Sequence, residues 1–194
     1  MFGWLVLGLL VLIGIFLIGM YNGLVRLKVQ CDNAWADIDV QLKRRYDLIP
    51  NLVETVKGYA AQERQVLTEV TEARAKVSQI KVDASTITDP EKFKQFQDAQ
   101  NALSGALGRL LVTVERYPDL KSNQNFLALQ SQLEGTENRI AVARRDYIEA
   151  VRVYNTELET FPGRLWASTL YRSYKPMATF TVAEDATKPP TVKF

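Results

Sequence analysis

The sequence predicts an all-α protein, in which an N-terminal transmembrane helix continues into an up-and-down four-helix bundle with long helices. Three observations predict this class. The chain begins with an uncharged apolar run, apolar residues recur beyond it at steps of three and four, and only short breaks separate these repeats. We expect three parts: an anchor over residues 1–25, a helical bundle over residues 26–162, and a membrane-proximal segment with a C-terminal tail over residues 163–194.

The anchor is predicted from charge and length. No charged residue precedes Arg26, and residues 4–20 are almost wholly apolar. About 20 helical residues cross the hydrocarbon core of a bilayer, so this run is long enough to span it. A cleaved secretory signal is the alternative, but no basic region precedes the run and no small-x-small cleavage site follows it. We therefore expect a retained single span.

Basic residues lie only on the C-terminal side of the predicted span. Arg26 and Lys28 follow it directly, and Lys43, Arg44 and Arg45 lie further on. Cytoplasmic flanks of membrane spans are enriched in such residues. The expected orientation therefore places the N-terminus outside and the bundle in the cytoplasm.

The first helix is expected to continue from the span to about residue 48, and Pro50 marks the first break. Proline has no amide hydrogen to donate, and it disfavours helical angles at the preceding Ile49. We expect a turn or kink here. The second helix should then cover residues 51–82, where apolar residues keep helical spacing.

Local chemistry marks the start of the third helix. Asp89, Pro90 and Glu91 supply a capping oxygen, a first-turn proline and an early acid. This helix should end near Tyr117, and a fourth helix over residues 126–161 carries the longest apolar seam in the chain. Four aromatic residues are interpreted as core residues: Trp35, Tyr59, Tyr147 and Tyr154.

The alternating helix directions predict that the fourth helix returns to the membrane surface. Basic and amphipathic aromatic residues are expected at this membrane surface. The candidates are Arg26, Lys28, Arg164, Trp166, Arg172 and Lys175. Each base near an anionic leaflet contributes about 1 kcal/mol to membrane binding. The alternative is a solvated loop whose aromatics cap the bundle. Residues 179–182 and 191–194 are β-prone, and this tail is either disordered or a strand added to a neighbouring subunit.

Composition excludes several kinds of site. Histidine is absent and Cys31 is the single cysteine, so one chain cannot form a His-based or Cys–His catalytic centre or a multi-cysteine metal site. The 24 basic and 22 acidic residues nearly balance, so nucleic acid is not an expected partner. No phosphate loop, nucleophile elbow or zinc motif occurs. We expect no cofactor, no metal and no enzymatic activity.

Charged residues near the apolar seams are the remaining candidate sites. Glu63 and Arg74 lie about three turns apart on one face of the expected second helix. Glu137 lies beside the seam of the fourth helix, near Arg144. The carboxylates could bind a metal or act as acid and base. Alternatively, these residues form inward charge pairs that fix helix register, or they snorkel to the surface.

Two arginine pairs, Arg44–Arg45 and Arg144–Arg145, could bind phosphates or acidic partners. Adjacent helical residues point about 100° apart. One member of each pair is therefore expected to point inward or sideways, and the other into solvent.

Several motifs follow one another in an order typical of one protein family. They are Tyr21–Asn22, Trp35, Arg44–Arg45, Pro50–Asn51, Glu63, Tyr117–Pro118, Glu137 with its neighbours, Tyr154–Asn155 and Phe161–Pro162. On these motifs the chain resembles the LemA family of bacterial membrane proteins. Ile148 stands where the family usually has asparagine, and residues 166–176 are less family-like. The resemblance implies a single anchor with a helical bundle at the bacterial inner membrane, and no established enzymatic activity.

Three functions are consistent with these features. The favoured one is a membrane-anchored, non-catalytic scaffold that self-associates or recruits partners, in membrane shaping or envelope maintenance. The second is a membrane-tethered sensing or binding module for a partner helix or a small ligand. The third is an enzyme with ionisable groups in a cavity near Glu63 or Glu137. The expected partners are the lipid bilayer, further copies of the chain, and a membrane or cytoplasmic protein.

Overall fold

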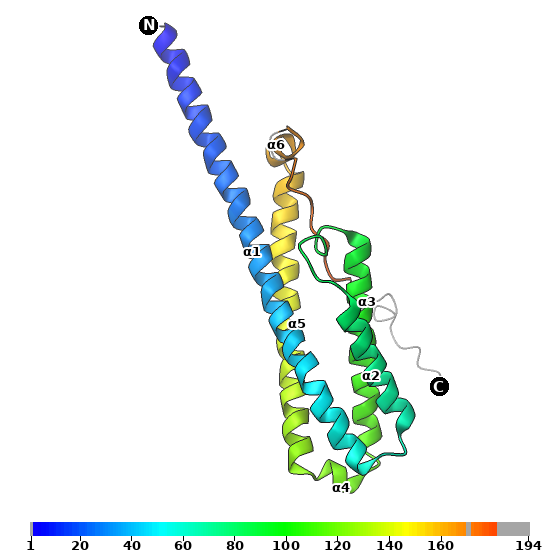
Figure 1. The fold of residues 1–194 in the computed structure, drawn as a ribbon. Helices are drawn as coiled ribbons and strands as arrows, with labels where there is room; N and C mark the ends of the chain where they lie inside the picture. The colour runs from blue at the N-terminus through cyan, green and yellow to red at the C-terminus, as the bar shows by residue number, and fades with distance from the viewer. Residues whose placement is uncertain (1, 170–171, 182–194) are drawn as a thin grey trace, which may run out of the picture.

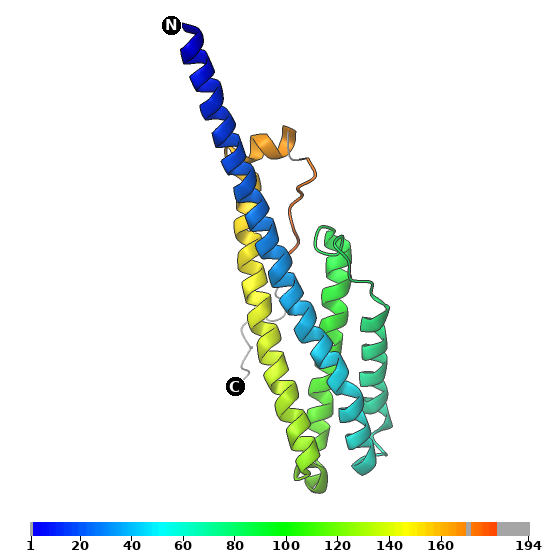
Figure 2. The same cartoon turned by 60° about the vertical axis from the view of Figure 1, so that its left-hand side comes forward.

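A computed structural model describes residues 2–169 and 172–181, and every regular element within these ranges is an α-helix, as the sequence predicts. The helices are α1 (Phe2–Tyr59), α2 (Arg64–Gln79), α3 (Pro90–Val114), α4 (Pro118–Lys121), α5 (Gln124–Glu159) and α6 (Gly163–Thr169) (Figure 1). α1 and α5 lie side by side, and so do α2 and α3, while the N-terminal part of α1 extends beyond the rest (Figures 1 and 2).

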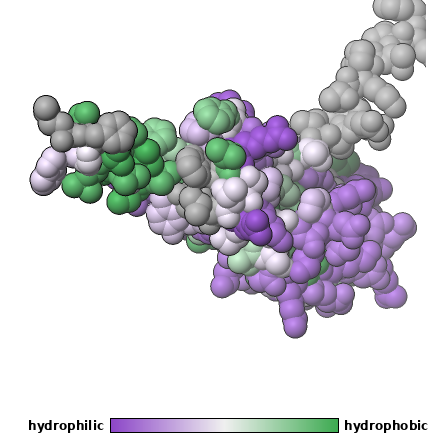
Figure 3. All heavy atoms as spheres, turned by 90° about the horizontal axis from the view of Figure 1, so that it is seen from above, coloured by the Kyte–Doolittle hydropathy of each residue, from purple (hydrophilic) through white to green (hydrophobic). Residues whose placement is uncertain are grey.

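The N-terminal part of α1 carries the apolar run and is long and apolar enough to cross a bilayer. None of this apolar stretch is buried within the protein. Seen from above, hydrophobic surface gathers towards one end of the molecule, whereas the visible body is mainly hydrophilic (Figure 3). The apolar run of the predicted anchor is therefore exposed and can contact lipid, whereas Leu24 near the end of the anchor is buried in the protein.

The expected turn at Pro50 is wrong, because α1 continues through this proline without interruption to Tyr59. A proline in a helix leaves the carbonyl four residues before it without its usual amide donor. That carbonyl belongs to Tyr46, and it accepts a hydrogen bond from Arg74 Nε at 3.3 Å. A side chain from α2 therefore replaces the missing backbone donor and stabilises the helical path.

The first turn of the chain lies later than expected, between Tyr59 and Arg64. Val56 O accepts from Ala60 N at 2.8 Å, and Ala60 O accepts from Glu63 N at 3.0 Å. The second helix consequently begins at Arg64 rather than at residue 51, and it ends at Gln79 rather than near residue 82. Residues 51–59, which the sequence pattern assigned to the second helix, belong to the end of α1.

The predicted start of the third helix is confirmed. Asp89 precedes α3, and its side chain accepts hydrogen bonds from the amides of Glu91 and Lys92. Pro90 occupies the first turn, where its missing amide hydrogen costs nothing. The Asn123 side chain caps α5 in the same way by accepting from Phe126 N at 3.0 Å.

Two core clusters fill the space between the helices. The distal cluster joins the end of α1 to α2, α3, α4 and the start of α5, with members such as Leu52, Val56, Val70, Leu110 and Leu133. The proximal cluster lies nearer the anchor and joins α1, α3 and α5. Burying each of these side chains contributes about 1.5–3 kcal/mol relative to leaving it exposed.

Aromatic rings dominate the proximal cluster. The ring centres of Trp35 and Phe96 lie 5.2 Å apart, and those of Trp35 and Tyr147 lie 5.4 Å apart. Tyr154 is also buried, so three of the four predicted core aromatics are confirmed. Tyr59 is the exception, because 46% of it is exposed at the distal end of α1.

Residues 172–181 run back from α6 along the bundle. Ala178 N donates to Ile87 O at 2.8 Å, and the Gln97 side chain donates to Thr181 O at 2.7 Å. This part of the tail is thus held by its own chain. The last residue of the β-prone segment 179–182 and the whole of the β-prone segment 191–194 lie outside the described residues.

Candidate functional site

Arg45 is the centre of a polar cluster inside the protein. Only 1% of this residue is exposed. Its Nη1 donates to Ser104 Oγ at 2.7 Å and to Glu137 Oε1 at 2.9 Å, and its Nη2 donates to Gln100 Oε1. The guanidinium therefore links α1, α3 and α5 through a fork of donors. This geometry fixes the register of the three helices.

Arg144 lies close to the same cluster, on α5. Burial lowers the pKa of this arginine, the charge of Arg45 lowers it further, and Glu137 raises it. Its guanidinium lies 4.8 Å from the centre of the Phe180 ring. The carboxylate of Glu137 is thus bonded to Arg45 and acts on Arg144 only through its charge. Among the described residues, Arg144 Nε and Nη2 have no hydrogen-bond partner.

The arginine pairs divide between inside and outside, as helix geometry predicts. Arg45 is buried while Arg44 is exposed. Arg144 is partly buried while Arg145 is exposed. The inner member of each pair thus faces the interior, and the outer member faces solvent.

Glu63 and Arg74, which were expected on one face of the second helix, have different partners in the structure. Glu63 precedes α2, and its Oε1 accepts from the Tyr117 hydroxyl at 2.7 Å and lies 3.3 Å from Arg116 Nη2. This hydrogen bond is the main reason that the pKa of Tyr117 is raised. Arg74 instead bonds the Tyr46 carbonyl, and its guanidinium lies 3.8 Å from the centre of the Tyr46 ring. Both residues have structural partners.

Glu63 and Glu137 have no shared site. Glu63 lies at the distal turn, whereas Glu137 bonds Arg45 in the middle of α5. Among the described residues, no group of three or more histidine, cysteine, aspartate or glutamate residues is placed to hold a metal ion. The arrangement therefore offers charge pairing rather than a paired-carboxylate centre.

The Tyr154–Asn155 motif holds the described part of the tail. Asn155 Nδ2 donates to Met177 O at 2.9 Å, and Met177 N donates back to Asn155 Oδ1 at 2.9 Å. The Tyr154 hydroxyl donates to Lys175 O at 3.2 Å. These bonds give this motif a structural role that spacing along the sequence could not indicate.

The other candidate residues take varied positions. Pro118 begins α4, Phe161 and Pro162 form the turn between α5 and α6, and Asn51 is exposed on α1. Tyr21, Asn22 and Arg26 are exposed just beyond the apolar run, and Lys28 forms an ion pair with Asp32 at 2.6 Å. Arg164, Arg172 and Lys175 are exposed around α6, while the side chain of Trp166 lies outside the described residues.

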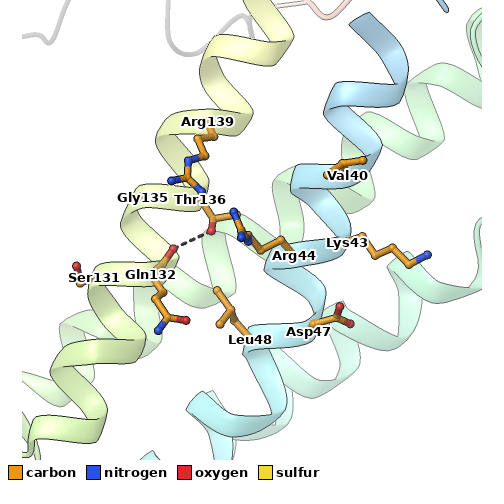
Figure 4. A pocket seen from close by; sticks show the side chains of 10 residues that line it. All are labelled: Val40, Lys43, Arg44, Asp47, Leu48, Ser131, Gln132, Gly135, Thr136 and Arg139. Atoms are coloured by element: carbon orange, nitrogen blue, oxygen red, sulfur yellow. Dashed lines mark hydrogen bonds between the residues drawn. The ribbon is translucent and has the colours of Figure 1, made fainter. Parts of the chain in front are cut away.

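A groove runs between α1 and α5 on the surface, and sequence patterns did not locate it. One hollow of about 690 Å³ is lined by ten residues, namely Val40, Lys43, Arg44, Asp47, Leu48, Ser131, Gln132, Gly135, Thr136 and Arg139. Figure 4 shows Arg44 reaching from α1 and Arg139 from α5 towards the gap beside Thr136. Thr136 Oγ1 itself donates to Gln132 O at 2.7 Å, so this hydroxyl is already engaged.

A second hollow of about 360 Å³ extends the groove towards the anchor. Arg139 lines both hollows, and the second also contains Asp37, Gln41, Val142 and Asp146. Val40 on α1 is 60% exposed, and Val142 on α5 is 48% exposed. In the sequence, the groove could have been indicated only by these two valines, which lie outside the apolar seams and have charged neighbours of both signs.

The family model described as the LemA family matches residues 34–194. The chain belongs to the LemA family. This match covers the bundle, the polar cluster around Arg45, the groove and the tail, and it confirms the resemblance drawn from the motifs.

Several curated relatives are similar to this LemA-family chain. Protein LemA of Metamycoplasma hominis is 30% identical over 152 residues, which cover 77% of this chain and 65% of the relative. Magnetosome protein MamQ of Magnetospirillum gryphiswaldense is 24% identical over 158 residues, covering 73% of this chain and 58% of the relative. Magnetosome protein MamQ 1 of Paramagnetospirillum magneticum is 26% identical over the same length. The match thus spans less than two thirds of each relative.

These relatives and the exposed apolar part of α1 together indicate a membrane protein. None of the relatives carries the name of an enzyme.

Proposed function

We propose that this LemA-family protein is a membrane-anchored, non-catalytic scaffold that self-associates at the bacterial inner membrane, with its bundle in the cytoplasm. The observation that carries the proposal is the continuity of α1. Its 58 residues extend from the apolar run into the core without a break. At a rise of 1.5 Å per residue the helix is roughly 85 Å long. A rod of this kind transmits the direction of the anchor to the whole bundle.

The anchor restricts how copies can meet. Copies in one membrane stand in the same direction, because α1 enters the bilayer at the same end of each. The groove between α1 and α5 therefore lies at the same height above the membrane in every copy, where a neighbouring copy can reach it. A helix of that neighbour could cover Val40 and Val142 and meet charges of both signs along the groove. Such lateral contacts form rings or arrays, which suits a scaffold.

The proposal is tested by the size of the full-length protein in mild detergent. A double variant, Val40→Asp with Val142→Asp, places charge on both exposed valines of the groove. The matched control is Val112→Asp, since Val112 on α3 is 72% exposed and lies outside the groove. We expect wild type and the control to contain more than one copy, and the double variant to be a single copy. Equal sizes for all three proteins would remove the groove as the interface.

A second function is favoured by the same groove. Its hollows are not filled by the chain's own side chains, so a helix of a different membrane or cytoplasmic protein could occupy them. In that case the wild-type protein is a single copy when purified alone. The size measurement therefore separates the scaffold from the binding module.

A further inference from the structure

We propose that the corner formed by the end of α5, α6 and residues 172–175 is a second membrane contact, which lies among the headgroups and binds anionic lipids. This contact is independent of self-association. It depends only on the anchoring of α1 in a bilayer.

The height of the corner follows from a contact between two tyrosine rings. Tyr21 lies directly after the apolar run, about where a span of 20 residues that begins near residue 3 leaves the hydrocarbon core. The ring of Tyr174 packs edge-on against the ring of Tyr21, with 6.4 Å between their centres. Tyr174 therefore lies at the level of the headgroups, where tyrosine is enriched in membrane proteins.

The direction of α6 suits a surface element. Figure 2 shows that α6 turns away from the line of α5 and lies across the direction of the long helices instead of continuing α5. A bilayer crossed by α1 would have α6 along its surface. The corner is also closely built: a Cβ atom at Gly163 would lie 1.9 Å from Glu157 O, so only glycine permits this approach of α6 to α5.

The apolar residues of the corner divide into two groups. Ala167 and Tyr174 pack against the proximal core cluster, which accounts for them as a cap on the bundle. Phe161 in the turn before α6 is 84% exposed, and Leu165 on α6 is 49% exposed. A cap does not need these two side chains, whereas a lipid interface would cover them.

The charges of the corner favour an anionic leaflet. Arg26, Arg164, Arg172 and Lys175 are exposed, and none of them takes part in an ion pair in the described part of the chain. Glu157 and Glu159 provide the opposing negative charge at the end of α5. Lys28 does not belong to this group of unpaired bases, because it pairs with Asp32. The bases of this corner therefore outnumber its acids.

The test places a nitroxide label on Leu165→Cys in the full-length protein, reconstituted into vesicles of phosphatidylcholine with or without phosphatidylglycerol. The native Cys31 is fully buried, and burial raises the pKa of its thiol to about 11, so it should remain unlabelled. Collisions with oxygen and with a water-soluble nickel chelate report the depth of the label. Val112→Cys on α3 is the matched control, since it is exposed and apolar but far from the anchor.

We expect the label at position 165 to meet oxygen more often and nickel several-fold less often than the label at 112. The label should lie deeper when phosphatidylglycerol is present. In a second protein, Arg164→Gln, Arg172→Gln and Lys175→Gln are added, and this dependence on phosphatidylglycerol should disappear. Equal, water-like collisions at 165 and 112 would overturn the membrane contact. A depth unchanged by phosphatidylglycerol would overturn the role of anionic lipid.

Discussion

Arg74 allows Pro50 to lie within a helix, and removing it should destabilise the protein in a way that depends on that proline. In Arg74→Ala the Tyr46 carbonyl loses the donor that replaces the missing amide of Pro50. A hydrogen bond from a charged donor contributes about 1.5–3 kcal/mol to stability. The contact of the guanidinium with the Tyr46 ring adds about 0.5–1 kcal/mol. The free energy of unfolding should therefore fall by about 2–4 kcal/mol.

The proline supplies the decisive comparison. Pro50→Ala restores a backbone amide, which can donate to the Tyr46 carbonyl as in any helix. In that background Arg74→Ala should lose only the ring contact, at about 0.5–1 kcal/mol. The interaction free energy between the two sites should thus be about 1.5–3 kcal/mol.

Urea unfolding of the four proteins in mild detergent, followed by far-ultraviolet circular dichroism, measures these differences. Lys76→Ala is the matched control, because Lys76 is an exposed base on the same helix. Its effect should stay within about 0.5 kcal/mol. If Arg74→Ala costs the same with proline and with alanine at position 50, the explanation given for the continuity of α1 is wrong.

Three further outcomes are expected. Arg45→Met removes three hydrogen bonds that join α1, α3 and α5, so it should lower the free energy of unfolding by about 2–4 kcal/mol. A loss below about 0.5 kcal/mol would show that these bonds do not hold the three helices together. Asn155→Ala removes both bonds to Met177, so limited proteolysis should cut residues 172–181 faster than in wild type; unchanged cutting would show that other contacts suffice. A membrane-impermeant maleimide should label Val112→Cys only after cells are lysed, because the bundle is expected in the cytoplasm; labelling of intact cells would reverse the orientation.

The helical class, the start of α3 and the apolar seam of α5 could be predicted because they depend on local chemistry. Asp89 and Pro90 define the start of α3 through bonds within four residues, and the apolar seam of α5 repeats along one face. The path through Pro50 could not be predicted in this way. It depends on Arg74, which lies 28 residues from Tyr46 in the sequence and meets it only after α2 has folded back.

The candidate site was predicted in part. Helix geometry indicated that one arginine of each pair points inward, but the partners of Arg45 come from two other helices and are not adjacent in the sequence. The groove arises only when α1 and α5 lie side by side, so neither helix alone shows it. Likewise, the role of Asn155 became apparent only with Met177 beside it.

The central claim is that the anchored rods assemble with one another in the membrane. Its most direct test is the mass of the full-length protein in lipid discs taken from membranes without detergent, with imaging of the same particles. The scaffold predicts discs that hold two or more copies in contact along their bundles. Discs that hold one copy each, at the protein's native abundance, would contradict it.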